Sequence, residues 1–275
     1  MRRAGRALRC ALFLAVVCAC ATPVKLASHD ERSRPLSLTA YLSMPSQAGP
    51  VPAVVLMHGC AGINMGKATL TWDRWFVAHG IATLEVDSFT GRGWGYVCTN
   101  PTYVTETGSR WRLPDAQAAL DYLRGLPGID KDRIVLMGFS HGAATALLAQ
   151  GTPRLAYNAF IAVYPYCGGG PRAIAYTTPT LILIGAKDDW TPAQLCEDLF
   201  DARRAIVDAG LELRVYPDAY HAFDSPAGPF FVQGCCTNGG TKTRFAGYDA
   251  YAYRQSRIDV AEFLNRRLAL TIVSD

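Results

Sequence analysis

The sequence predicts an α/β fold, in which a mostly parallel central sheet is covered by helices on both faces. Short apolar runs alternate along the chain with segments of helical periodicity, which is the pattern of successive strand–helix units. The chain has 275 residues, 50% of them hydrophobic, and it shows no low-complexity tract or solenoid repeat. These features favour one large domain, which we place at residues 30–275.

Six short apolar runs predict the strands, because runs of this length and composition suit a sheet that is buried on both faces. They cover residues 53–57, 81–86, 133–137, 160–164, 180–184 and 212–216. Helices are predicted between and after them, at residues 70–79, 113–126, 143–150, 193–209 and 248–268. Two Gly- and Pro-rich stretches, 89–101 and 224–243, are too long for simple connections, so we expect them to line a binding cleft.

The start of the chain has the pattern of a secretory signal, which we place at residues 1–21. Four arginines precede an apolar run of about twelve residues, and small residues end that run. The run is too short to cross a bilayer core of about 30 Å as a helix, so no membrane span is expected. A buried N-terminal helix is the alternative, but four arginines without an acidic residue favour export to the periplasm or the medium.

Two ways of leaving the membrane stay open for this signal. Ala19-Cys20-Ala21 fits a cleavage site with release after Ala21. Residues 17–20 also resemble a bacterial lipobox, in which Cys20 would carry a lipid anchor. The unusual cysteine at the second lipobox position favours soluble release.

Removal of the signal changes the charge balance. The full chain has 27 Lys and Arg against 23 Asp and Glu, a formal charge of +4. The signal holds four of the arginines and no acidic residue, so the rest of the chain is close to neutral. We therefore expect no nucleic-acid partner.

Cysteine usage agrees with export, because disulfides persist in oxidising compartments. Six of the nine cysteines follow the signal: Cys60, Cys98, Cys167, Cys196, Cys235 and Cys236. Their pairing stays open; Cys98 is one candidate partner of Cys60, and the adjacent pair at 235 and 236 is too strained to bond to itself. No C-x-x-C or H-E-x-x-H pattern occurs, so no metal site is expected.

Residues 138–142 match the pattern G-x-S-x-G and predict that Ser140 is a nucleophile. The match stands directly after the strand at 133–137 and before an Ala- and Leu-rich helix. On such a turn the serine Oγ projects above the sheet, and the helix N-terminus faces the charge that develops on the substrate oxygen. The alternative is an ordinary strand–helix turn with an idle serine.

A serine hydroxyl needs a base, and that base needs a carboxylate to orient it. His221 follows the strand at 212–216 and is the candidate base, with a surface loop histidine as the alternative. Asp188 and Asp189 follow the strand at 180–184, and we favour Asp188 as the orienting acid. The other aspartate would then cap the following helix. The order Ser, Asp, His is the order that a G-x-S-x-G nucleophile takes with its partners.

Two backbone N–H groups are candidates to bind the oxyanion of the substrate. His141 follows the nucleophile, and Cys60 lies in the loop after the strand at 53–57. The thiol of Cys60 is expected to be structural rather than reactive.

Four motifs together resemble the dienelactone hydrolase-like proteins of the α/β-hydrolase superfamily. They are H-G-C-A-G, G-F-S-H-G, G-A-K-D-D-W-T-P and Y-H-A-F-D, in that order, and the resemblance covers roughly residues 53–223. The resemblance implies an α/β-hydrolase fold, with Ser140 as nucleophile, Asp188 as acid and His221 as base. It also implies Cys60 and His141 as oxyanion donors, and neither a cofactor nor a metal.

The chain departs from the founding dienelactone hydrolases at two places. Those enzymes use a cysteine nucleophile where this chain has Ser140, and they carry a glutamate where this chain has Gly59. In that family an arginine binds the substrate carboxylate, and Arg92 lies near its place; a solvated loop arginine is the alternative. The departures argue against a dienelactone as the substrate.

The function predicted from these residues is hydrolysis of a small-molecule carboxylic ester through an acyl-enzyme. A peptidase or a thioesterase would use the same three residues, because loops and pockets set the leaving group. A non-catalytic binding protein of the cell envelope is a third alternative, which the complete Ser/Asp/His set disfavours. The oligomeric state is not predicted.

Overall fold

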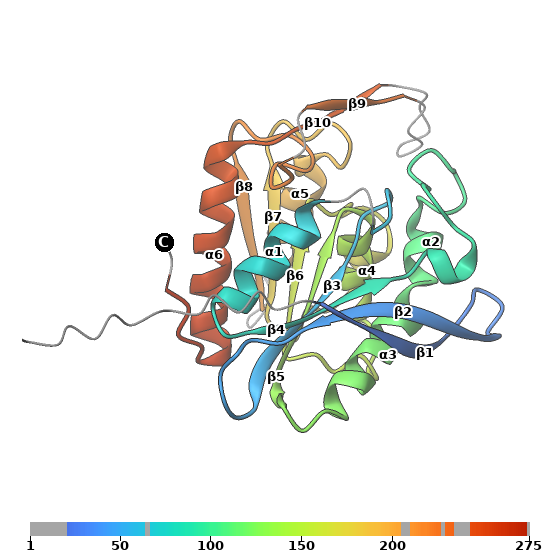
Figure 1. Ribbon diagram of the computed structural model, residues 1–275. Coiled ribbons are helices and arrows are strands. Elements are labelled where there is room, and N and C mark those ends of the chain that lie inside the picture. The colour runs from blue at the N-terminus through green and yellow to red at the C-terminus, as the bar shows by residue number, and fades with distance from the viewer. Residues whose placement is uncertain (1–20, 64–66, 205–209, 227–228, 234–242, 274–275) are drawn as a thin grey trace, which may run out of the picture.

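A computed structural model describes residues 21–63, 67–204, 210–226, 229–233 and 243–273 of the chain. Its centre is an eight-stranded sheet with the order β1-β2-β4-β3-β5-β6-β7-β8 (Figure 1). The strands are β1 (Thr22–His29), β2 (Pro35–Ser43), β3 (Val51–Met57), β4 (Ala82–Asp87), β5 (Ile129–Phe139), β6 (Ala159–Val163), β7 (Thr180–Gly185) and β8 (Leu211–Tyr216). β3 to β8 run parallel, whereas β2 pairs antiparallel with both β1 and β4.

Helices cover both faces of this sheet, as the sequence predicts. The longer helices are α1 (Lys67–Ala78), α3 (Leu113–Arg124), α4 (His141–Ala149), α5 (Ala193–Arg204) and α6 (Ala250–Leu268). Shorter ones are η1 (Thr90–Arg92), α2 (Glu106–Arg110) and η2 (Gly170–Ala173). Because side chains alternate along a strand, Val54 and Leu56 of β3 pack in the cluster that holds α1 and α6, and Val55 packs in the cluster that holds α3 and part of α4. Figure 1 shows α6 on the opposite side of the sheet from α3 and α4.

The six predicted strands correspond to β3 to β8, although Ile81 precedes β4 and Tyr164 follows β6, and the α/β-hydrolase type of fold is confirmed. The predicted helix at 193–209 corresponds to α5, which is described up to Arg204; residues 205–209 lie outside the described part. The predicted signal lies almost wholly outside it, since the description begins at residue 21. Within the described part, no helix combines the length and the apolar character that a bilayer crossing requires.

The start of the domain is corrected by the structure. The sequence analysis placed it at residue 30, but β1 already begins at Thr22 and pairs with β2 along its whole length. Only Leu26 and Ser28 of β1 are buried, so this edge strand lacks the strong apolar run that predicts a strand from sequence. The Ser28 hydroxyl donates to Asp115 of α3 at 2.6 Å, which ties the edge to the helix layer.

Two disulfides join described residues, Cys60 to Cys98 and Cys167 to Cys196. The first joins the loop after β3 to the Gly-rich stretch 89–101, and the second joins the loop after β6 to α5. Cys235 and Cys236 lie outside the described residues. Part of the other long stretch, 224–243, forms β9 (Phe230–Val232), which pairs antiparallel with β10 (Arg244–Ala246), just after the stretch, beyond the carboxyl edge of the main sheet (Figure 1).

Candidate active site

Ser140 stands between β5 and α4 in a backbone conformation that is rare for a residue with a side chain. Its φ is 52° and its ψ is −112°. The two glycines of the motif permit this tight turn: a Cβ on Gly138 would lie 2.1 Å from the carbonyl oxygen of Gly142, and one on Gly142 would lie 2.1 Å from that of Met57. Strand, turn and helix therefore pack backbone against backbone, and the strained turn lifts Ser140 above the end of the sheet.

His221 lies within hydrogen-bond distance of Ser140. Its Nε2 is 2.9 Å from Ser140 Oγ, and its Nδ1 is 2.7 Å from Asp188 Oδ2. An Nδ1–H that donates to the carboxylate leaves Nε2 free to accept the serine proton. The imidazole is buried, and the rings of Tyr164 and Trp190 lie against it with centroids 4.7 Å away. The structure thus brings together three side chains that follow three different strands.

Both carboxylate oxygens of Asp188 accept hydrogen bonds. Its Oδ1 accepts the backbone N–H groups of Trp190 and Thr191, at 2.9 and 2.8 Å. Its Oδ2 accepts the Thr191 hydroxyl at 2.9 Å, in addition to His221. The neighbouring Asp189 is instead 45% exposed and accepts from the backbone of Phe245. Of the two aspartates that the sequence offered, only Asp188 contacts the histidine.

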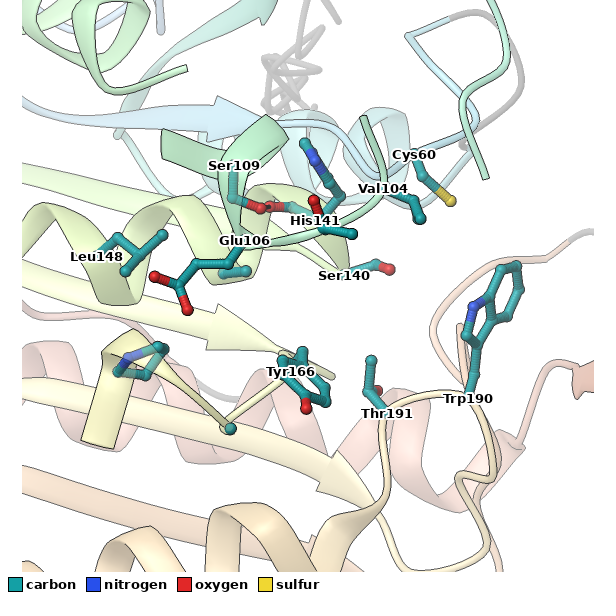
Figure 2. Close-up of a pocket in the computed structure, with 14 residues that line it drawn as sticks. Cys60, Val104, Glu106, Ser109, Ser140, His141, Leu148, Tyr166, Trp190 and Thr191 are labelled. Atoms are coloured by element: carbon teal, nitrogen blue, oxygen red, sulfur yellow. Dashed lines mark hydrogen bonds between the residues drawn. The ribbon is translucent and has the colours of Figure 1, made fainter. Parts of the chain in front are cut away.

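Cys60 and His141 both line the cavity that adjoins Ser140 (Figure 2). The imidazole of His141 is turned toward Arg112, whose Nη1 donates to its Nδ1 at 2.8 Å, while its Nε2 donates to the carbonyl of Tyr103. Burial and the charge of Arg112 hold the pKa of His141 well below its ordinary value, so the ring is neutral. Its role as an oxyanion donor would therefore belong to its backbone N–H alone.

Arg112 is a residue of this site that the sequence analysis missed. Its guanidinium is fully buried, and the same Nη1 that reaches His141 also donates to the carbonyl of His58, at 2.9 Å. It therefore bridges the loop after β3 and the start of α4, the two segments that carry the predicted oxyanion donors. Burial lowers its pKa to about 9, and its Nε and Nη2 have no hydrogen-bond partner among the described residues. A lone arginine before a predicted helix carries no sequence signal for such a role.

The predicted substrate role of Arg92 is corrected by the structure. Its side chain is 1% exposed, and its guanidinium forms an ion pair with Asp115 at 2.8 Å. The same group donates to the backbone carbonyls of Ser88, Trp111 and His29. These contacts join the stretch 89–101 to β1 and α3, and they leave the guanidinium without access to either cavity beside Ser140. Arg92 is a structural residue.

Two cavities open on Ser140. The larger, of about 230 Å³, extends along α4 and includes Thr191; the smaller, of about 90 Å³, includes His221. Both contain Cys60 and Trp190, so the cavities meet at the serine. Within the described residues, no group of three or more His, Cys, Asp and Glu side chains is arranged to hold a metal ion.

Comparison with known proteins gives the same family as the motifs. The model of the dienelactone hydrolase family matches residues 38–268. A relative from Bradyrhizobium sp., named a probable 2-oxo-3-(5-oxofuran-2-ylidene)propanoate lactonase, is 27% identical over 199 residues, which are 68% of this chain and 79% of that protein.

Solved structures with the same fold include two esterase-like proteins. The dienelactone hydrolase-like promiscuous phosphotriesterase P91, from metagenomic libraries, superposes with a TM-score of 0.63 at 21% identity, over 90% of this chain and 99% of its own. Thermogutta terrifontis esterase 2, phosphorylated by paraoxon, gives a TM-score of 0.63 at 18% identity over 91% and 96%. At these identities the likeness concerns the fold. The family match covers most of the chain, which therefore belongs to the dienelactone hydrolase family and is a hydrolase of that type.

Proposed function

We propose that the protein hydrolyses carboxylic esters through an acyl-enzyme on Ser140. The observation that carries this proposal is the continuous hydrogen-bond chain from Ser140 Oγ to His221 and on to Asp188, at 2.9 and 2.7 Å. Both distances suit proton transfer without any rearrangement. The lactonase name of the Bradyrhizobium relative is in keeping with this, since a lactone is a cyclic ester.

In the proposed reaction Ser140 Oγ attacks the ester carbonyl while His221 Nε2 takes the hydroxyl proton. Asp188 stabilises the imidazolium that forms. The backbone N–H groups of Cys60 and His141 bind the oxyanion of the tetrahedral intermediate. Collapse breaks the bond to the alkoxy group, which leaves as the alcohol with the proton from Nε2. Water, deprotonated by the same nitrogen, then releases the carboxylic acid and restores the serine.

The test of this function is the replacement Ser140→Ala with p-nitrophenyl acetate as substrate. We expect turnover to fall to the level that binding and the oxyanion donors support alone, about 10³–10⁴-fold over the uncatalysed reaction. Ser46→Ala is the matched control, because Ser46 is exposed and lines neither cavity beside Ser140. Substantial turnover by a folded Ser140→Ala protein would overturn the proposal.

A second measurement separates an enzyme from a binding protein and ranks the leaving groups. A fluorophosphonate probe should label wild-type protein at Ser140 and should leave Ser140→Ala unlabelled. An ester, a thioester and a peptide of the same acid can also be compared in parallel assays. The ester should have the highest kcat/KM. A folded wild-type protein that does not label would favour a non-catalytic role, and a preference for the peptide or the thioester would replace the esterase by those activities.

We further propose that the protein works outside the cytoplasm. The two disulfides support this location, since they persist under oxidising conditions. Mass spectrometry of protein from the periplasm and the medium should find either Thr22 as the first residue or a lipid on Cys20. Retention of full-length protein in the cytoplasm, with free thiols, would contradict the proposal.

A further inference from the structure

The two cavities at Ser140 are not equivalent toward an ester, and the position of His221 distinguishes them. In the proposed reaction the leaving oxygen must accept the proton of His221 Nε2, so the alcohol part has to lie on the histidine side. His221 and Ala222 line the smaller cavity, and neither lines the larger one. The acyl part is then left with the larger cavity. This assignment rests on the proposed function.

The larger cavity follows the axis of α4. Ser140, Ala144 and Leu148 all line it, at spacings of four residues that keep them near one face of the helix. The rise of an α-helix places Leu148 about 12 Å from Ser140 along that axis. Ala144 and Leu148 are buried, at 7% and 2% exposure, yet neither belongs to the hydrophobic clusters of the core. Their side chains line a cavity instead of packing against the sheet.

The lining of this cavity is chiefly apolar and contains no cationic side chain among the described residues. Val104, Leu148 and Pro171 contribute aliphatic surface. No lysine or arginine among the described residues lines it. Its one acidic side chain is Glu106, whose carboxylate binds Arg110 on one oxygen and the backbone N–H of Gly170 on the other. Figure 2 shows Glu106 and Leu148 on one side of Ser140, with Cys60 and Trp190 on the other.

We propose that the cavity along α4 binds the acyl group of the ester, and that it accepts an uncharged, mainly apolar acyl chain up to about two helical turns long. Acyl groups with a second carboxylate are excluded, because no lysine or arginine among the described lining residues compensates their charge, and the Glu106 carboxylate, although paired with Arg110, presents only acceptor oxygens to them. The family resemblance predicted an arginine for a substrate carboxylate, whereas Arg92 is occupied by Asp115. The substrate class is therefore the esters of neutral aliphatic or aromatic acids.

Substitutions along α4 test how far the acyl chain extends into the larger cavity. The assay is kcat/KM for p-nitrophenyl esters from acetate to decanoate, with wild type, Ala144→Leu and Leu148→Phe. Ala144→Leu adds bulk one helical turn from Ser140. It should therefore lower the ratio of kcat/KM for the hexanoate ester to kcat/KM for the acetate ester at least tenfold. An apolar pocket discriminates by about this factor against a chain that misfits by about one methylene. Leu148→Phe, one turn further, should change that ratio less and should lower the decanoate-to-hexanoate ratio.

Val232→Phe is the matched control, because Val232 lines only the smaller cavity. It should shift the preference among alkyl acetates with growing alcohol chains and should keep the hexanoate-to-acetate ratio of wild type. Thermal unfolding of each variant shows that it is folded. If Ala144→Leu alters the alcohol series and spares the acyl series, the orientation is the reverse of ours and the inference is overturned. Hydrolysis of acetate with no effect of either α4 substitution overturns the inference and spares the proposed function; hydrolysis of no ester overturns both.

The charge preference has its own test, with the mono-p-nitrophenyl ester of adipic acid against p-nitrophenyl hexanoate. Wild type should have the higher kcat/KM for the neutral ester. Glu106→Gln should reduce the ratio of the two kcat/KM values about fivefold, because the substitution removes one nearby, partly screened charge. The control is Glu262→Gln, since Glu262 is 58% exposed on α6. Equal rates on both esters with wild type, or an unchanged preference in Glu106→Gln, would overturn the exclusion of charged acyl groups.

Discussion

The two halves of the site are held in place by different means. The acid–base half, with Asp188 and His221, follows β7 and β8, and its carboxylate accepts four hydrogen bonds from residues at most 33 positions away. The proposed oxyanion half comprises the loop after β3 and the start of α4. The disulfide joins that loop to the stretch 89–101, and the buried Arg112, which lies 54 residues from His58, joins the loop to α4.

The difference concerns how completely each buried charge is compensated. Asp188 has no unpaired oxygen, and this arrangement is favourable for a buried carboxylate. Arg112 keeps two nitrogens without a partner among the described residues, and a buried charge in that condition is costly. Another close contact of Arg112 is with the ring of Phe89, whose centroid lies 5.0 Å from the guanidinium carbon. The comparison indicates that the buried charge of the acid–base half is compensated by hydrogen bonds, whereas the incompletely compensated charge of Arg112 in the oxyanion half lowers the stability of the folded protein.

The largest effect is expected from Asp188→Asn. An amide cannot hold His221 in the tautomer that accepts the serine proton, and in serine hydrolases this change costs about 10⁴-fold in kcat. Asp189→Asn is the matched control, because Asp189 is half-exposed and does not touch His221. Steady-state kinetics with p-nitrophenyl acetate measures both. Similar losses in the two variants would mean that the acid–base half is not centred on Asp188.

Arg112→Met should have the next largest effect. It removes the bridge between His58 and His141, so the two segments with the oxyanion donors can shift, and a shift of about 1 Å costs up to about 100-fold in kcat. KM should change little, because the residue does not line either cavity beside Ser140. Arg112→Lys keeps the charge and one hydrogen bond, and it should restore part of kcat. A lower unfolding temperature with unchanged kcat would assign Arg112 to stability alone.

The two disulfides can be removed separately, and the kcat values of two variants with similar losses of stability can then be compared. The chain-entropy account gives about 4 kcal/mol for each, because 38 residues separate Cys60 from Cys98 and 29 separate Cys167 from Cys196. Removing either pair by double substitution to alanine should therefore lower the unfolding free energy similarly. The variant without Cys60–Cys98 should also lose about tenfold in kcat, because that bond holds the oxyanion loop. Equal kcat in both variants, measured well below their unfolding temperatures, would contradict this.

The smallest effect on activity is expected at Glu85, a buried charge outside both halves. Burial raises its pKa to about 7 from the ordinary 4.5, and its Oε1 has no partner among the described residues. Between about pH 4.5 and about 7, the Glu85 carboxyl therefore stays protonated in the folded state and is ionised in the unfolded state. The unfolding free energy should fall as pH rises through this range, by up to about 3 kcal/mol. Glu85→Gln should flatten this dependence in urea titrations and leave kcat unchanged. A steeper dependence in the variant would exclude Glu85 as its origin.

Local patterns were sufficient for the elements that the acid–base half uses. Ser140 could be singled out because strand, glycine turn and helix are consecutive in the chain, and His221 and Asp188 because each follows a buried apolar run. The parallel arrangement brings the carboxyl ends of such runs to one edge of the sheet, so proximity followed from the order of elements. The edge hairpin β1–β2 lacks such a run and was not predicted.

The sequence by itself determined the fold class, the strand–helix turn that holds Ser140 and the family, because each depends on neighbouring residues or on the order of strands. Only the tertiary structure decided that Arg92 pairs with Asp115, that Arg112 joins the oxyanion segments, and that Cys60 bonds to Cys98. These contacts join residues 23 to 54 positions apart. A long side chain has many partners within reach in a compact domain, and only the packed backbone selects one of them.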